Sequence, residues 1–151
     1  MPQHAAFAPI ALLMFLSGIG IPILATFNAG LGTQLGSATA ATFVLFAVGL
    51  ALSAAIVAVT GLPPRSSFTV EHPHFYFGAA FMLFYALSVT WAAPRIGVGN
   101  AVFFVLLGQL VAAAIIDHFG LWGALKAEIT GRRIAGIGLM ALGVYLARKP
   151  V

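Results

Sequence analysis

The sequence predicts an all-helical, polytopic membrane protein with five transmembrane helices. Of its 151 residues, 62% are hydrophobic and 7% are charged, and the mean hydropathy is +1.08. The apolar residues form five blocks with almost no charge inside them, at 5–27, 38–59, 75–93, 97–116 and 132–147. A soluble chain of this length could not bury so much apolar surface. We therefore expect residues 1–151 to form a single transmembrane domain.

The first block, residues 5–27, is long enough to cross a hydrocarbon core of about 30 Å as a helix. It has no Lys or Arg at its start, and its apolar run exceeds the roughly 7 to 15 residues of a signal peptide. We expect a retained helix. Pro22 lies deep in this span and should kink it, with Gly18 and Gly20 giving room one turn earlier. Kinked membrane helices often line cavities, and this one could do so. Alternatively, the kink has no ligand nearby.

The second and fourth blocks, residues 38–59 and 97–116, also have the length of a membrane span. Gln109 lies near the middle of the fourth block, close to the bilayer midplane. An amide with unmet hydrogen bonds is costly there. We therefore expect Gln109 to have a partner, which is either another helix or a substrate.

The third block, residues 75–93, carries a polar and aromatic stripe. Phe81, Tyr85, Ser88 and Trp91 recur at helical spacing and should lie on one face. The stripe could line a substrate path. Alternatively, the phenyl rings face lipid and Trp91 is an interfacial anchor.

The fifth block, residues 132–147, is short for a span. The basic side chains at its two ends must therefore extend to the lipid headgroups. They are Arg132, Arg133, Arg148 and Lys149.

One face of the fifth block is made mostly of small residues. Gly136, Met140, Gly143 and Ala147 follow one another at spacings of one helical turn. Such faces allow two helix backbones to approach closely in lipid. The partner could be a helix of the same chain, but we expect Gly136, Gly143 and Ala147 to form a dimer interface.

The basic residues specify the orientation of the chain only weakly. Five spans place Lys and Arg on two sides, four against three, so that the bias is 4 − 3 = 1. The two sets are Arg65, Lys126, Arg132 and Arg133 on the N-terminal side and Arg95, Arg148 and Lys149 on the other. Orientation follows this bias, so both orientations could coexist and form an antiparallel homodimer. The alternative is a single orientation with the N-terminus inside.

No ionisable residue lies in the middle of a predicted span. Asp117 and His118 lie side by side at the end of the fourth block, where a carboxylate and an imidazole could relay protons near neutral pH. Alternatively, the pair only ends a helix and meets water or Arg95. The chain has no cysteine and no evident nucleophile, acid pair or metal-ligand cluster. We therefore expect that the protein is not an enzyme and that it binds no metal, cofactor or nucleic acid.

Several short motifs occur in the order that one known family shows. They are Asn28-Ala29-Gly30-Leu31-Gly32, Phe46-Ala47-Val48-Gly49, Ala93-Pro94-Arg95-Ile96-Gly97, Gly108-Gln109-Leu110 and Asp117-His118-Phe119-Gly120. On these residues the chain resembles the YdcZ family of the drug/metabolite transporter superfamily. The resemblance implies an exporter of the bacterial inner membrane, built as a five-helix unit that is found singly with dual topology, in pairs or as ten-helix fusions. Leu24 stands where members of this family commonly carry a glutamine.

Together these features predict a small-solute transporter that works by alternating access as a dual-topology homodimer with ten helices. The substrate path would lie near the two-fold axis, next to Asn28, Tyr85, Ser88, Trp91 and Gln109. Two other functions fit the same residues. One is a dual-topology channel, and the other is a structural membrane subunit without transport activity.

Overall fold

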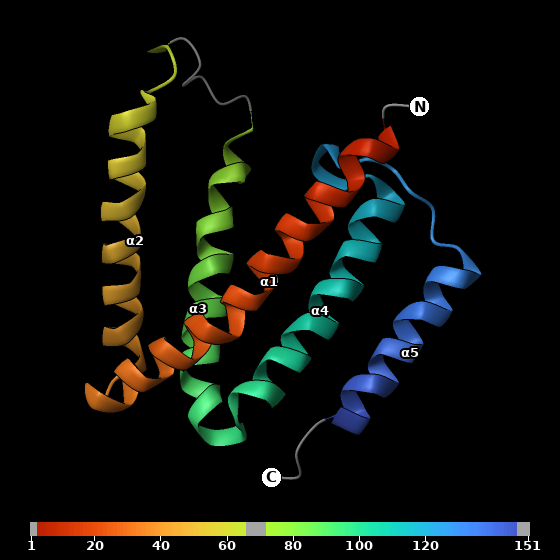
Figure 1. The fold of residues 1–151 in the computed structure, drawn as a ribbon. Coiled ribbons are helices and arrows are strands. Elements are labelled where there is room, and N and C mark those ends of the chain that lie inside the picture. Colours follow the sequence, from red (N-terminus) through yellow and green to blue (C-terminus); the bar gives the residue numbers. More distant parts are fainter. Residues whose placement is uncertain (1–2, 66–71, 148–151) are drawn as a thin grey trace. The chain divides into compact units, whose positions relative to one another are not determined.

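The computed structural model describes residues 3–65 and 72–147, and the regular elements in these ranges are helices (Figure 1). They are α1 (Gln3–Gln34), α2 (Ala38–Thr60), α3 (Gly78–Ile96), α4 (Val98–Phe119) and α5 (Gly131–Ala147), with short 3-10 helices η2 (Pro73–Phe77) and η3 (Leu121–Gly123). By length and composition, α1, α2, α3 with η2, and α4 could each cross a membrane. The prediction of an all-helical membrane protein is confirmed. The fifth predicted helix is present as α5, but its 17 residues do not place it among these spans.

The chain forms two units, residues 1–95 and residues 96–151. The first unit holds α1, α2 and nearly all of α3, and the second holds α4, η3 and α5. Within the first unit α1 packs against α2, and within the second α4 packs against α5.

Helix α1 is longer than predicted and continues to Gln34. The chain leaves the helix at Gly36, whose φ of +62° is a conformation that glycine adopts at little cost. Ser37 then caps α2, because its Oγ accepts a hydrogen bond from the N–H of Ala40 at 3.1 Å. Asn28 was expected to follow the first helix and instead lies inside it.

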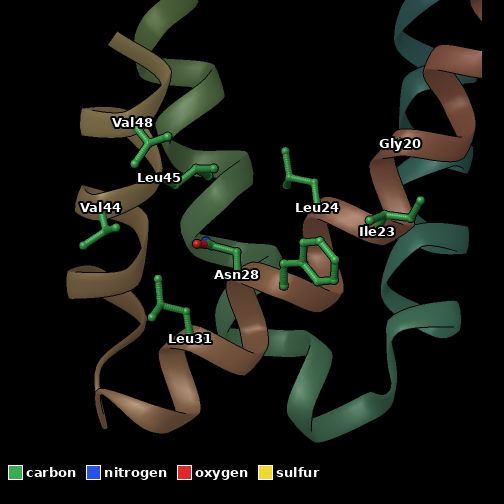
Figure 2. Close-up of a pocket in the computed structure, with 9 residues that line it drawn as sticks. Gly20, Ile23, Leu24, Asn28, Leu31, Val44, Leu45 and Val48 are labelled. Atoms are coloured by element: carbon green, nitrogen blue, oxygen red, sulfur yellow. The ribbon is translucent and has the colours of Figure 1, made fainter. Parts of the chain in front are cut away.

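The expected bend in α1 is present. Pro22 has no N–H, so the carbonyl of Gly18 loses its usual helical partner. Figure 2 shows that α1 changes direction between Gly20 and Asn28. The part of α1 after the bend contacts both α2 and α3 through Asn28 and its neighbours.

Helices α3 and α4 also end later than predicted. Pro94 lies in the last turn of α3, where its missing N–H leaves the carbonyl of Thr90 without its usual helical partner, and the helix continues to Ile96. Gly97, with a φ of +86°, separates α3 from α4. Helix α4 continues past its predicted end and stops before Gly120, which is left-handed with a φ of +62°.

Three helices of the first unit meet at Gly32. A Cβ atom on Gly32 would lie 3.0 Å from Cγ2 of Thr90 on α3 and 3.7 Å from Cβ of Ala41 on α2. Ala41 and Thr90 are almost fully buried. The missing side chain at position 32 therefore allows α1 to approach α2 and α3 closely, as small residues do between helices in lipid.

Most of the apolar surface of the single chain is exposed. In the most apolar window of each long helix, 6% of the residues are buried in α1 and in α2, and 17% in α3 and in α4. The buried apolar side chains are mostly alanines, whereas many large apolar side chains are exposed. Such a surface needs hydrocarbon or another protein surface around it.

We expect Gly32→Ala to lower the unfolding free energy by about 1 kcal/mol. The steric clash of the new methyl group with Thr90 should cost more free energy than the higher helix propensity of alanine gains. Gly30→Ala is the matched control, since a Cβ there meets no atom within 4 Å. It should keep or raise the stability. Both can be measured by reversible unfolding in mixed micelles. Equal stability of the two variants would show that the close contact at Gly32 is not needed.

Candidate functional site

A cavity of about 440 Å³ lies between α1 and α2 in the first unit (Figure 2). We call it the α1–α2 groove. It is lined by Gly20, Ile23, Leu24, Phe27, Asn28 and Leu31 of α1 and by Val44, Leu45 and Val48 of α2. Its volume is within the range of about 300 to 1,000 Å³ that is typical of small-molecule sites. Asn28 contributes the only polar side chain of the lining.

The orientation of the Asn28 amide follows from its hydrogen bonds. The hydroxyl of Thr90 donates its one hydrogen to the carbonyl of Ala86 at 2.7 Å. It can therefore only accept from Asn28, so the atom 2.5 Å away must be Nδ2. Oδ1 points away from Thr90 and accepts no hydrogen bond from the residues that the structure describes. Figure 2 shows the amide extending into the groove toward α2.

The polar and aromatic stripe is not the packed face of α3. Phe81 and Trp91 are exposed, and Tyr85 and Ser88 are half-buried. The hydroxyl of Tyr85 is buried and has no hydrogen-bond partner among the described residues. The fully buried face of α3 consists of Ala86, Val89, Thr90 and Ala93. Of the stripe, neither Tyr85 nor Ser88 lines the α1–α2 groove.

Trp91 and Arg95 form a pair near the end of α3. The guanidinium carbon of Arg95 lies 4.2 Å from the centroid of the Trp91 ring, and Arg95 also donates a hydrogen bond to the Trp91 carbonyl. Both residues line a second cavity of about 490 Å³ in the first unit, next to the turn between α1 and α2. An exposed cation–π pair of this kind contributes about 0.5 to 1 kcal/mol. Its position near a helix end is typical of an interfacial anchor.

Gln109 belongs to the second unit and is exposed on α4. It makes no hydrogen bond with the described residues. The partner that the sequence led us to expect is therefore not found in the described part of this chain. Asn28 belongs to the first unit, so the two amides do not share a site within either unit.

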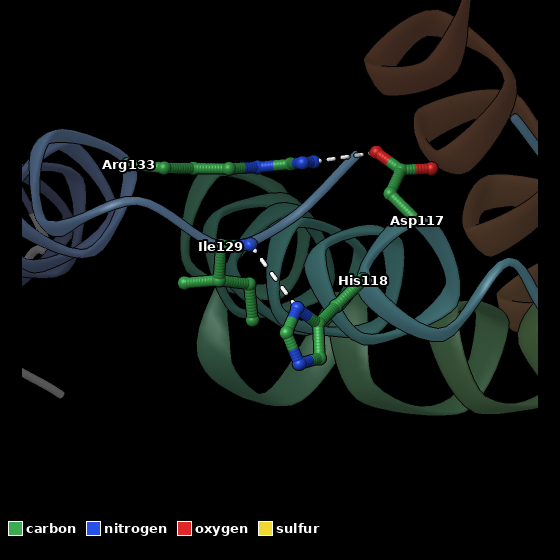
Figure 3. A network of polar contacts seen from close by, with 4 residues as sticks. All are labelled: Asp117, His118, Ile129 and Arg133. Carbon is green, nitrogen blue, oxygen red and sulfur yellow. Dashed lines mark hydrogen bonds and ion pairs between the residues drawn. The ribbon is translucent and has the colours of Figure 1, made fainter. Parts of the chain in front are cut away.

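Asp117 and His118 connect the end of α4 to the segment before α5 (Figure 3). Oδ2 of Asp117 pairs with the guanidinium of Arg133 at 2.6 Å. Nδ1 of His118 accepts a hydrogen bond from the N–H of Ile129 at 3.1 Å, so its neutral form carries the proton on Nε2. The carbonyl of Asp117 accepts a further bond from the N–H of Ala127 at 2.8 Å. Both candidate coupling residues thus have structural partners.

The small face of α5 does not pack against α4. Gly136, Gly143 and Ala147 are exposed, and a Cβ on either glycine would meet no atom within 4 Å. The half-buried residues of α5 lie on another face, at Arg133, Ile137, Ala141 and Val144. Arg148 and Lys149, which were expected to extend to the headgroups, lie outside the described residues.

Thr90, whose hydroxyl holds the amide of Asn28, is not among the residues predicted from the sequence. A signal for it exists, because Thr90 lies one helical turn from both Ala86 and Ala93. These three residues form a small face on α3 like the small face found on α5. Small faces predict close helix contacts, and a hydroxyl on such a face would reach a polar group on the facing helix.

The model of a family described as "Putative inner membrane exporter, YdcZ" matches residues 9–146. This match covers most of the chain and includes all or most of each long helix. No curated protein and no solved structure matches the chain significantly.

The pair between Asp117 and Arg133 should contribute little to stability, because about a third of each side chain is exposed. In a double-mutant cycle with Asp117→Asn and Arg133→Gln, we expect a coupling below about 1 kcal/mol that shrinks at high salt. Glu128→Gln, in the same connection and exposed, is the control. A transport activity that loses its proton dependence in Asp117→Asn alone would instead assign this carboxylate a coupling role.

Proposed function

The chain belongs to the YdcZ family of inner membrane exporters, and we propose that it moves a small solute by alternating access as an antiparallel homodimer. The family and the long apolar helices already make it a multi-pass transporter of the inner membrane. The observation that carries the finer proposal is the bent α1, which presents a buried amide to an otherwise apolar groove. Interrupted helices with a few polar groups are typical of transporter sites.

In this proposal α5 is the fifth span. Its 17 residues give about 25 Å of helix, which requires the basic side chains at its ends to extend to the headgroups. The small face with Gly136, Gly143 and Ala147 would then pack against a second copy. This face is exposed in the single chain and so is free to meet a second copy, which supports this role. Close packing of small residues, rather than hydrophobic burial, drives helices together in lipid.

The solute would pass near the two-fold axis of this dimer. Asn28 and Gln109 supply amides, Tyr85 and Ser88 supply hydroxyls, and Trp91 supplies an aromatic wall. Gln109 supports this path because its amide is exposed on an apolar helix. In a bilayer such an amide needs a partner, which would be the solute or the second copy.

Asp117 and His118 are the candidates for proton coupling in this scheme. A proton on Asp117 would weaken its pair with Arg133 and so loosen the connection to α5. Any proton step would therefore act on the contact between α4 and α5.

Counterflow in proteoliposomes tests the function, because only a carrier exchanges labelled solute against a gradient of unlabelled solute. The solute would be one that raises the thermal stability of the purified protein in a metabolite screen. We expect Gln109→Leu to abolish counterflow with little change in stability, and the amide control Gln34→Leu to retain it. If Gln109 only joins helices, its variant should lose about 0.6 kcal/mol of stability and keep counterflow. Flux without counterflow would indicate a channel, and no flux a structural subunit.

Topology can be tested with reporters at the C-terminus, which should give signals from both sides of the membrane because the charge bias is one. Leu62→Lys together with Leu125→Lys should force one orientation. Both leucines are exposed in connections on the same predicted side. A wild-type reporter found on one side only, in cells without a paired homologue, would contradict dual topology.

A further inference from the structure

The α1–α2 groove combines an apolar wall with a single unpaired acceptor. Asn28 is only 5% exposed, and its Nδ2 is used by Thr90 at 2.5 Å. Oδ1 accepts nothing from the described residues. A carbonyl oxygen in an apolar environment is costly until a donor reaches it. The alkyl chain of a lipid has no donor to offer.

The groove contains no charge to balance a charged ligand. Neither α1 nor α2 contains an Asp, Glu, Lys or Arg anywhere along its length. A buried ion without a partner is strongly disfavoured. The cavity of about 440 Å³ has room for a small molecule of one or two rings.

We infer that the α1–α2 groove binds an uncharged, mostly apolar molecule with one hydrogen-bond donor, such as a phenol or an alkyl alcohol, whose hydroxyl donates to Oδ1 of Asn28. The inference rests on the proposed transport function, because it names the class of solute that the site would carry. Thr90 acts as a positioning residue, since its hydroxyl turns Oδ1 toward the groove.

The direct test compares 2-naphthol with its methyl ether, in which a methyl group replaces the hydrogen-bond donor. Saturable binding is measured to the full-length protein in nanodiscs, with protein-free nanodiscs as the blank. Wild type should bind 2-naphthol about five- to tenfold more tightly than the ether, which corresponds to one net hydrogen bond. A charged analogue, 2-naphthylmethylammonium, should bind more weakly than 2-naphthol.

Variants assign this preference to Asn28. Asn28→Leu should reduce the ratio of the two affinities to about one, while Thr90→Val should keep a ratio above one because the acceptor is still present. If Asn28→Leu alone does not fold, Asn28→Leu with Thr90→Val removes both partners and leaves no unpaired group. Val48→Trp fills the groove and should block both probes. Leu50→Trp, exposed on the same helix but outside the groove, should not.

Three results of the binding experiment would overturn the inference, and a fourth concerns the oligomeric state. They are equal affinities of the two probes for wild type, a ratio that survives Asn28→Leu, and binding that Val48→Trp leaves unchanged. Binding to the monomer but not to the dimer would also overturn it, since a second copy would then occupy the groove. Counterflow with equal probe affinities would refute only this inference. A donor preference without counterflow of 2-naphthol or any screened solute would refute only the transport function.

Discussion

The contact of α1 with α3 through Asn28 and Thr90 organises the first unit. The bond between them is 2.5 Å long and buried, and the adjacent Gly32 lets the two helices approach until Thr90 would touch a Cβ there. In a bilayer, helix contacts depend on such close packing and on hydrogen bonds, because lipid tails are as apolar as the side chains. The bend at Pro22 also matters, because it gives the second part of α1, which makes these close contacts, a direction different from that of the first part.

The same contact gives the groove its chemical character. Because the proton of Thr90 is used by Ala86, the amide of Asn28 has one possible orientation, and its oxygen faces the apolar wall. A helix contact that stabilises the fold therefore also sets the polarity of a cavity. Leu24, which lines this cavity, adds no polar group one turn away, so the groove presents one acceptor and little else that is polar.

The second unit holds its polar residues differently. Asp117 and His118 sit in the last turn of α4. Asp117 forms an ion pair with Arg133 of α5, and His118 accepts a hydrogen bond from the backbone of the segment that leads to α5. These groups lie where solvent can still reach them, so they join elements at modest energetic gain. Gln109 has no partner among the described residues, although it lies in the middle of an apolar helix. Its amide is the polar group of this unit that most requires something outside the described chain.

The sequence by itself determined the fold class, the number and order of the helices, and the bend at Pro22, because block length, charge and the missing proline N–H are local properties. It placed Asn28 just after the first helix, because the apolar block ended at Phe27. The helix in fact continues to Gln34, and the left-handed Gly36 follows it. Only the tertiary structure decided that Asn28 bonds to Thr90, that Asp117 pairs with Arg133, and that the aromatic stripe of α3 is not its buried face. Those outcomes depend on which helix faces which, and helical spacing fixes a residue's face but not the neighbour that the face meets.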